Sequence, residues 1–459
     1  MAILLSRRGF IRNTGFALGG LTCWGLAPHP FSRLLMAAPT AQDKKLLFIF
    51  QTGGNDGINT VIPRGDADYN TTTRPTLFIP ENQALDTGNG FAQLHPRLQP
   101  MMEIYNHSRL NGQDGPGNLA VLHRVGYAGQ SQSHFDSQQY WQNGVPGNAK
   151  LEEGLFYRHL DKTLDLSSQA NSFVAAALSS SQMVALKGAN PVPNFSRAGD
   201  FNAVGTPARA GKFLGQPPSR PGASDGEGLL GLYGGQAEAP GRPYRAAVHD
   251  TGRMLGNTIT TLQNAISLGA YAPDNNATYP TGSFGDKLRE AALLFKRTPV
   301  RILGLNLGGW DTHTNQGQIN GGHGNLLNNL ALGFQALYRD LQAQWNNLLI
   351  VTMTEFGRTS RENGSGGTDH ADSSVLFIAG GAVKGGVYNC DATSWKSGDM
   401  FSKNNRYLAR RTDFRPVFGE ILTRHFGDNP ALLDEIMPGY SRAAAENPAT
   451  FQMLGFLNA

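Results

Sequence analysis

The sequence predicts an α/β protein with a mainly parallel central sheet and helices on both of its faces. Three observations lead to this class. Short, continuous apolar runs are typical of strands that are buried on both faces. Segments with helical periodicity lie between these runs, and strands that alternate with helices form parallel βαβ units. Glycine-rich and polar residues follow most of the runs, as expected where buried strands end.

Five apolar runs are the expected strands. They cover residues 46–50, 118–125, 300–307, 348–353 and 375–379. Four longer segments have the period of about 3.6 residues that is typical of an amphipathic helix. They cover residues 244–268, 284–295, 325–344 and 414–425.

Residues 42–459 are expected to form one α/β domain. Within it, residues 216–243 are rich in glycine and proline and lack periodicity, which is typical of a surface loop or lid. Residues 270–284 have the same character. We therefore expect a loop-rich insertion or lid with helical character at about 170–300.

The segment 1–41 has the zones of an export signal. Arg7 and Arg8 precede Phe10, a weakly apolar stretch covers residues 15–27, and small residues follow. Paired arginines in this position are typical of a twin-arginine signal, and an ordinary signal or a basic helix is the alternative. The twin-arginine interpretation predicts the twin-arginine export machinery as a partner and a periplasmic or extracellular location. The apolar stretch is too short and too rich in glycine for a stable membrane anchor.

Composition argues against several function classes. Charged residues make up 16% of the chain, below the usual ~25%, which disfavours a coiled coil and acidic disorder. The formal net charge of +4 equals the four arginines of residues 1–41, where no acid occurs, so the rest of the chain is neutral overall. We therefore expect no nucleic-acid partner. Removal of the signal would take Cys23 with it and leave Cys390 without a disulfide partner.

Polar residues gather where the expected strands end. In open α/β sheets, sites form beyond the carboxyl ends of the strands, so these residues are candidates for one shared site. They are Asp56, Ser133, His134, Asp311, His313, Glu355, Arg358, Asp369 and His370. Taken singly, each also has an ordinary structural interpretation, such as a turn residue, a hydrogen-bonded histidine or an ion pair.

The acids and histidines of this set predict a divalent metal site. Asp311 and His313 are two residues apart, so an extended backbone directs both side chains to one side. A carboxylate and an imidazole together bind zinc and similar ions. Several acids close together raise one another's pKa unless a cation neutralises them. The expected ligands are Asp56, Asp311, His313, Glu355, Asp369 and His370. They would hold one or two ions, with zinc expected first and magnesium, manganese or calcium as alternatives.

Ser133 and Arg358 are candidates for catalysis. A helix is expected to begin near Ser133, and a helix N-terminus favours an anion, so Ser133 is a candidate nucleophile. A simple N-cap role is the alternative. Arg358 and Arg361 have the chemistry to grip a phosphate or a sulfate, and a surface ion pair is the alternative for each.

Five short segments and the twin-arginine start carry a family resemblance. The segments read GGNDG at 53–57, SHF at 133–135, GWDTH at 309–313, EFGRT at 355–359 and GTDH at 367–370. From about residue 46 to 427 the chain resembles the bacterial family catalogued as domain of unknown function 1501. That family in turn resembles the alkaline phosphatase and sulfatase superfamily. The resemblance implies an alkaline-phosphatase-like sheet and a two-metal site that hydrolyses phosphate or sulfate esters, so the implied substrate is a small anionic ester.

The resemblance also implies roles for individual residues. Asp56 matches a metal-binding Asp that follows the first strand of the superfamily, and Ser133 falls where the nucleophile would be. Asp311 and His313 are similar to the Asp and His ligands of one metal, and His370 resembles the late His of that site.

The second metal is where the chain departs from the superfamily. The strand near 348–353 should be followed by an Asp-His pair, whereas this chain has Glu355 and Phe356. Glu can replace Asp as a ligand, but Phe cannot replace His. The departure leaves two questions open, whether a second metal binds and whether hydrolysis is retained.

The leading hypothesis is an exported, metal-binding, hydrolase-like protein that acts on phosphate or sulfate esters by metal-assisted in-line displacement. In it, metal activates Ser133 or water, Arg358 stabilises developing charge, and His134 or His370 moves a proton. The alternative is a non-catalytic binding or assembly protein of the cell envelope on a degenerate hydrolase scaffold, which Phe356 favours. A carbohydrate-active enzyme that uses the acids as an acid/base pair is a third hypothesis.

Overall fold

The computed structural model describes most of the chain after residue 43. The described residues are 44–107, 116–201, 216, 219–220, 225–228 and 243–458. The expected twin-arginine segment 1–41 and most of the expected loop 216–243 lie outside them. Residues 44–459 belong to one structural unit, to which everything below refers.

The described residues form one large sheet and one small sheet. The large sheet has the order β10-β5-β9-β8-β1-β7-β6, with β11 beside β5. Its strands are β1 (Lys45–Thr52), β5 (Leu119–Gly126), β6 (Ala175–Ala177), β7 (Ile302–Gly308), β8 (Leu348–Thr354), β9 (Ser374–Ala379), β10 (Gly386–Tyr388) and β11 (Thr412–Asp413). The small antiparallel sheet consists of β2 (Val61–Pro63), β3 (Leu85–Asp86) and β4 (Ala92–Leu94).

The large sheet is mostly parallel, as the sequence predicts. β1 pairs in parallel with β7 on one side and with β8 on the other. β9 is the exception, because it runs antiparallel to both of its neighbours, β8 and β5. Antiparallel neighbours need no crossover helix. The connecting loop 355–373 therefore starts and ends at the carboxyl edge of the parallel strands, and this edge is where the candidate site lies.

The strands of the sheet are buried on both faces. Alternate residues of β1 enter two separate apolar cores: Leu47 and Ile49 face one core, and Leu46, Phe48 and Phe50 face the other. This explains the continuous apolar run in the sequence, since both faces of each strand need apolar side chains.

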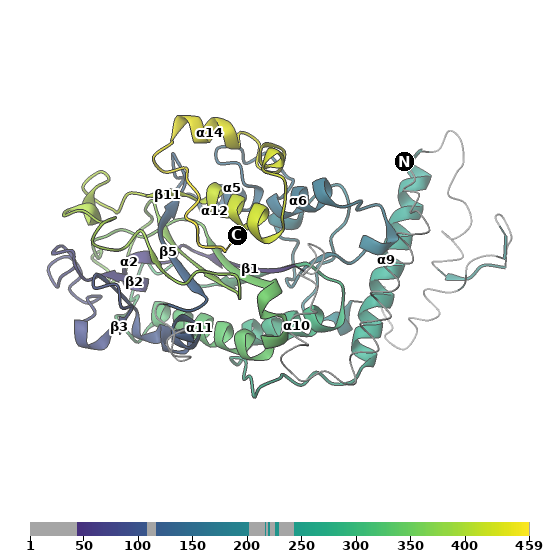
Figure 1. Ribbon diagram of the computed structural model, residues 1–459, viewed down its shortest axis with the longest axis horizontal. Helices are drawn as coiled ribbons and strands as arrows, with labels where there is room; N and C mark the ends of the chain where they lie inside the picture. The colour runs from purple at the N-terminus through teal and green to yellow at the C-terminus, as the bar shows by residue number, and fades with distance from the viewer. Residues whose placement is uncertain are drawn as a thin grey trace, which may run out of the picture. The chain divides into compact units, whose positions relative to one another are not determined.

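Helices cover both faces of this sheet (Figure 1). The helices of the described residues are α2 (Gly57–Thr60), α3 (Met102–Tyr105), α5 (His134–Asn143), α6 (Leu155–Thr163), α9 (Pro243–Ser267), α10 (Ser283–Arg297), α11 (Gly322–Asp340), α12 (Phe414–Glu420), α13 (Leu433–Ile436) and α14 (Tyr440–Glu446). Helices α10 and α11 pack on the face of Leu47, and α5, α6 and α12 pack on the opposite face. The expected α/β class is thus confirmed.

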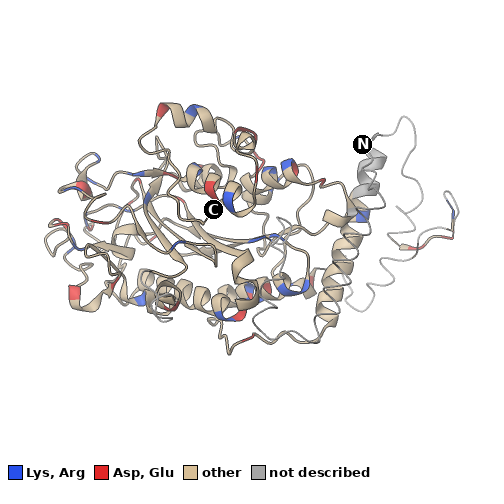
Figure 2. Cartoon of the chain, in the orientation of Figure 1, with Lys and Arg blue, Asp and Glu red and all other residues tan. Residues whose placement is uncertain are grey.

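The segment at about 170–300 contributes directly to this architecture. β6 adds an edge strand beside β7, and α10 packs in the same core as α11. Figure 2 shows acidic and basic residues interspersed along the described helices and loops. Among the described residues, no helix combines the length and the apolar character that crossing a membrane requires.

Candidate metal centre

Segments far apart in the sequence bring polar side chains together at the carboxyl edge of the sheet. The turn after β7 carries Asp311 and His313, and α5, which follows β5, begins with His134. The loop 355–373 between β8 and β9 carries His370. His370 lies shortly before β9 in the sequence. Because β9 runs antiparallel to its neighbours, His370 lies at the same edge of the sheet as His134, Asp311 and His313.

The turns after β1 and β7 approach each other so closely that glycine is required. Gly53 has a φ of +120°, and a Cβ at this position would lie 2.4 Å from the backbone nitrogen of Asp311. Only glycine tolerates both the positive φ and the contact. The close approach fixes Asp311 relative to the end of β1.

Ser133 is the N-cap of α5. Its backbone is extended, with φ −83° and ψ 126°, and its Oγ accepts a hydrogen bond of 3.4 Å from the backbone N–H of Asp136. The N-cap interpretation of Ser133 is therefore confirmed. The neighbours of Ser133 in the chain, Gln132 and His134, both contact the cluster described next.

Three histidine Nε2 atoms converge on the carboxylate of Asp311. His313 Nε2 lies 3.1 Å and His370 Nε2 lies 3.3 Å from Oδ1 of Asp311, and His134 Nε2 lies 3.5 Å from Oδ2. His313 Nε2 and His370 Nε2 are only 2.9 Å apart. Ligand atoms of His134, Asp311 and His370 all lie within 4.8 Å of one another, which is close enough to hold one metal ion.

The second nitrogen of each of these imidazoles, Nδ1, faces an oxygen acceptor. These acceptors are Oε2 of Glu355 for His134, Oδ1 of Asp369 at 3.1 Å for His313, and the backbone oxygen of Gln132 at 2.8 Å for His370. A neutral imidazole has one N–H and one lone pair. When Nδ1–H donates to these oxygens, the lone pairs on the three Nε2 atoms point into the cluster. The same partnership of imidazole with carboxylate or carbonyl orients metal-binding histidines in other proteins.

Lone pairs that face one another need a cation or a proton between them. When both Nδ1 atoms carry the hydrogens, the Nε2 atoms of His313 and His370, 2.9 Å apart, both present lone pairs and cannot form a hydrogen bond with each other. Burial opposes ionisation of Asp311, but the hydrogen bond and charge of Arg358, together with His370 and His313, lower the pKa of Asp311. The cluster therefore presents three imidazole nitrogens and one carboxylate, a set of ligands that could bind a divalent metal.

Glu355 and Asp369 brace the histidines from behind. Glu355 is fully buried, and its Oε1 accepts hydrogen bonds of 2.9 Å each from the Gly53 N–H and the Gln138 side chain. Burial raises the pKa of Glu355. Asp369 accepts a hydrogen bond of 3.0 Å from Asn363 in addition to its contact with His313. The sequence predicts both acids as metal ligands, whereas here they bind the Nδ1 side of the imidazoles.

Arg358 is enclosed and is not available to grip a substrate. Its guanidinium donates to the backbone oxygens of Gly54 at 3.0 Å, Thr368 at 2.9 Å and Trp310 at 3.2 Å, and also to that of Gly53. It also forms an ion pair with Asp311. Both sequence-based interpretations of Arg358, a substrate-binding group and a surface ion pair, are replaced by a third: it ties the carboxyl-edge loops together and orients Asp311.

Asp56 lies outside the cluster and is already satisfied by the chain. Its Oδ2 accepts hydrogen bonds of 2.6 Å from Arg74 and 2.7 Å from Gln316, and its Oδ1 caps α2 by accepting from the N–H groups of Ile58 and Asn59. Burial opposes ionisation, but Arg74, together with His323 and Gln316, lowers the pKa of Asp56 to about 2. The expectation that Asp56 binds metal thus gives way to a structural role.

Phe356 closes one side of the cluster. It is buried, its ring centroid lies 4.2 Å from that of His370, and it also contacts the ring of His134 at 5.0 Å. Phe356 therefore forms an apolar wall against the imidazoles of His134 and His370.

Sequence reasoning missed the residues that support the cluster. They are Gln132, Gln138 and Asn363 beside the histidines, and Arg74 and Gln316 beside Asp56. Gln132 acts through its backbone oxygen, so the identity of its side chain does not predict this role. The others are single amides or cations in loops or on a helix, where no local pattern marks them.

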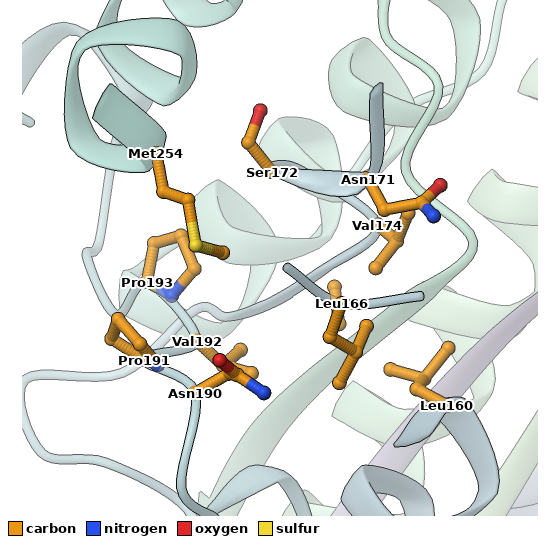
Figure 3. Close-up of a pocket in the computed structure, with 11 residues that line it drawn as sticks. Leu160, Leu166, Asn171, Ser172, Val174, Asn190, Pro191, Val192, Pro193 and Met254 are labelled. Atoms are coloured by element: carbon orange, nitrogen blue, oxygen red, sulfur yellow. The ribbon is translucent and has the colours of Figure 1, made fainter. Parts of the chain in front are cut away.

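A small apolar crevice near α9 is a separate feature (Figure 3). Its volume is about 20 Å³, far below the ~300–1,000 Å³ of typical small-molecule pockets. Figure 3 labels Leu160, Leu166, Asn171, Ser172, Val174, Asn190, Pro191, Val192, Pro193 and Met254 around it. None of these residues belongs to the histidine cluster, so the crevice is not part of the candidate site.

Comparison with known families matches part of the chain. Residues 260–405 match the family described as "Protein of unknown function (DUF1501)". The match supports the family resemblance over this segment, which carries Asp311, His313, Asp369 and His370. No curated protein matches the chain.

Proposed function

We propose that the protein is an exported metal-binding protein of the hydrolase type, which acts on phosphate or sulfate esters. The observation that carries the proposal is the cluster itself. Three imidazole lone pairs and the Asp311 carboxylate face one another at 2.9–3.5 Å, and each imidazole is fixed by an acceptor on its far side. A resident cation is the simplest partner for such a set.

The donor set favours zinc among the divalent ions. Magnesium and calcium prefer oxygen ligands, whereas imidazole nitrogen suits zinc and other transition metals. Zn–N bonds of about 2.0–2.1 Å in a tetrahedron place ligand atoms about 3.3 Å apart, close to the separations in the cluster. Among the described residues, Asp56 and Glu355 are engaged elsewhere and Phe356 offers no donor, so these residues favour one ion over two.

The chain supplies the other parts of an ester-hydrolysing site. When bound, a metal would act as a Lewis acid on the ester oxygens. Ser133, at the N-terminus of α5 between Gln132 and His134, is the candidate nucleophile, and the helix N-terminus favours the anionic group beside it. Glu355 holds the imidazole of His134 in place.

Export by the twin-arginine route belongs to the proposal. Arg7 and Arg8 are its basis, and folding before export would allow metal loading in the cytoplasm. The proposal predicts a periplasmic or extracellular protein and an interaction with the twin-arginine machinery. Replacing Arg7 and Arg8 together by lysine keeps the charge, and it should abolish recovery of the protein from the periplasmic fraction.

The second candidate is a non-catalytic binding or assembly protein of the cell envelope. Phe356 favours it, because an apolar ring fills the place of a metal ligand of the superfamily. This candidate predicts that zinc binds without turnover.

An ester screen on the zinc-loaded full chain tests the proposal. The substrates are p-nitrophenyl phosphate and p-nitrophenyl sulfate, and the variants are Asp311→Ala and, as a control on the same helix as His134, Asp136→Asn. Turnover that is lost in Asp311→Ala and kept in Asp136→Asn supports the hydrolase. Zinc binding without turnover of either ester supports the second candidate, and absence of zinc binding overturns the metal-based account.

A further inference from the structure

A cavity of about 460 Å³ opens beside the cluster. This volume lies within the range of small-molecule pockets, about 300–1,000 Å³. Two loops form it, at 359–369 and 401–406. The lining side chains that matter below are Arg361, Glu362, Asp369, Phe401 and Arg406.

Asp369 belongs to both the cavity and the cluster. Its Oδ1 lies 3.1 Å from Nδ1 of His313, and its Oδ2 lies 3.3 Å from Nη2 of Arg406. The cavity is therefore separated from the metal-binding imidazoles by one side chain. A substrate of moderate size could contact both.

The acids of the cavity wall are occupied by the protein. Glu362 accepts hydrogen bonds from the N–H groups of Thr76 at 2.8 Å and Leu77 at 3.1 Å, and from the Thr76 hydroxyl at 2.6 Å. Asp369 accepts from Asn363 and contacts His313. Neither acid needs a cation from a ligand.

The two arginines of the cavity keep donors available. Within the described part of the chain, Arg361 makes one long hydrogen bond, 3.5 Å to the Thr72 oxygen, and its guanidinium lies 5.4 Å from the centre of the Phe401 ring. The side chain of Arg406 is 59% exposed and contacts Asp369. A guanidinium carries five N–H donors, and a stacked guanidinium is held ready for a planar or tetrahedral anion. Arg358, by contrast, donates its N–H groups to backbone oxygens.

We propose that Arg361 and Arg406 bind an anionic group of the substrate other than the ester that reacts at the cluster. The proposal rests on the proposed function for the identity of the reacting site, and it adds the substrate class: an ester that carries a second anionic group, such as a carboxylate, sulfate or phosphate. Two guanidiniums on separate loops suit bidentate contacts with such a group. The sequence assigns anion binding to both Arg358 and Arg361, and the proposal keeps this role for Arg361 and adds Arg406 in place of the enclosed Arg358.

Titration of inorganic phosphate into the metal-free full chain tests the subsite without catalysis. The double variant Arg361→Gln/Arg406→Gln should weaken binding by ~10-fold or more, since two charge-assisted contacts are lost. The double lysine variant keeps the charge but cannot make the two parallel N–H contacts of a guanidinium, and we expect phosphate affinity to fall less than in the double glutamine variant. Arg289→Gln, at an exposed arginine on α10, should bind as the wild type does. Equal phosphate binding by the wild type and the double glutamine variant would overturn the proposal. Phosphate that binds only as an adventitious ion, outside this site, would also overturn it.

Kinetics on the zinc-loaded chain give a second, distinguishable readout. KM for 4-carboxyphenyl phosphate should rise at least ~10-fold in the double glutamine variant, and KM for phenyl phosphate should not change. If no ester is turned over, the proposed hydrolysis fails while the phosphate titration still decides the subsite. An equal rise in KM for both esters would contradict a distinct second-group subsite.

Discussion

Asp56 and Asp311 occupy equivalent positions and have opposite surroundings. Each follows a Gly-Gly pair, GGND at 53–56 and GGWD at 308–311, at the carboxyl ends of the neighbouring parallel strands β1 and β7. Asp56 is fully buried and accepts hydrogen bonds from Arg74, Gln316 and two backbone N–H groups. The side chain of Asp311 is 47% exposed and faces three imidazole nitrogens.

The difference shows what separates a structural acid from one that could bind a metal. Donors of the chain satisfy Asp56, so a cation there would have to displace a buried guanidinium. Asp311 has Arg358 as a donor, but the imidazoles around it present lone pairs when their Nδ1 atoms carry the hydrogens. The same short motif thus reaches two outcomes, and the residues brought from elsewhere in the fold decide between them.

The largest expected effect on stability comes from removing the arginine that pairs with Asp56. Arg74→Met leaves the Asp56 carboxylate buried and unpaired, and we expect the free energy of unfolding to fall by about 3–5 kcal/mol. Urea denaturation measures the loss. Arg289→Met, at an exposed arginine, should stay within about 0.5 kcal/mol of the wild type. A small effect of Arg74→Met on the free energy of unfolding would mean that the ion pair between Arg74 and Asp56 does not stabilise the fold.

The bracing acids should matter on the other side of the comparison. Asp369→Asn and Glu355→Gln remove the carboxylates behind His313 and His134, and we expect zinc affinity to fall by ~10–100-fold while one ion per chain still binds. Competition with a chelator of known affinity measures the change. Complete loss of zinc in either variant would indicate that the acid is itself a ligand.

Acid unfolding should report on Asp56. Its pKa is about 2 in the folded protein, below the ordinary 3.8, so its contribution is fully present above about pH 4 and is lost as the pH falls toward 2. The shift corresponds to about 2 kcal/mol. Urea denaturation between pH 2 and pH 6 should therefore show a shallower pH dependence in Asp56→Asn than in the wild type. Parallel curves for the two proteins would rule this contribution out.

The smallest expected effect separates the two roles of Ser133. Ser133→Ala removes the N-cap and should lower the free energy of unfolding by about 1 kcal/mol, whereas Ser133→Asp keeps a cap. If Ser133 is also the nucleophile, turnover is lost in both variants. Retained turnover in Ser133→Asp would limit Ser133 to capping.

The sequence predicts the architecture well because the relevant signals are local. Apolar runs and helical periodicity locate β1, β5, β7, β8 and β9 and helices α9–α12 to within a few residues. The antiparallel direction of β9 is not local, because it depends on where the chain returns to the sheet. That direction brings His370 to the carboxyl edge.

The candidate site is predicted only in part for the same reason. Asp311, His313 and His370 come together as the sequence predicts, and His134, predicted for proton transfer, joins them. Asp56 does not join, because its partners Arg74 and Gln316 lie 18 and 260 positions away in the chain. No spacing rule identifies such partners.

Zinc titration of the metal-free full chain by calorimetry tests the central claim most directly. We predict one zinc ion per chain, an affinity that falls by more than ~100-fold when His134, His313 or His370 is replaced by alanine, and unchanged stoichiometry in Asp56→Asn. Failure of the wild type to bind zinc, or equal binding by the wild type and His313→Ala, would contradict the account.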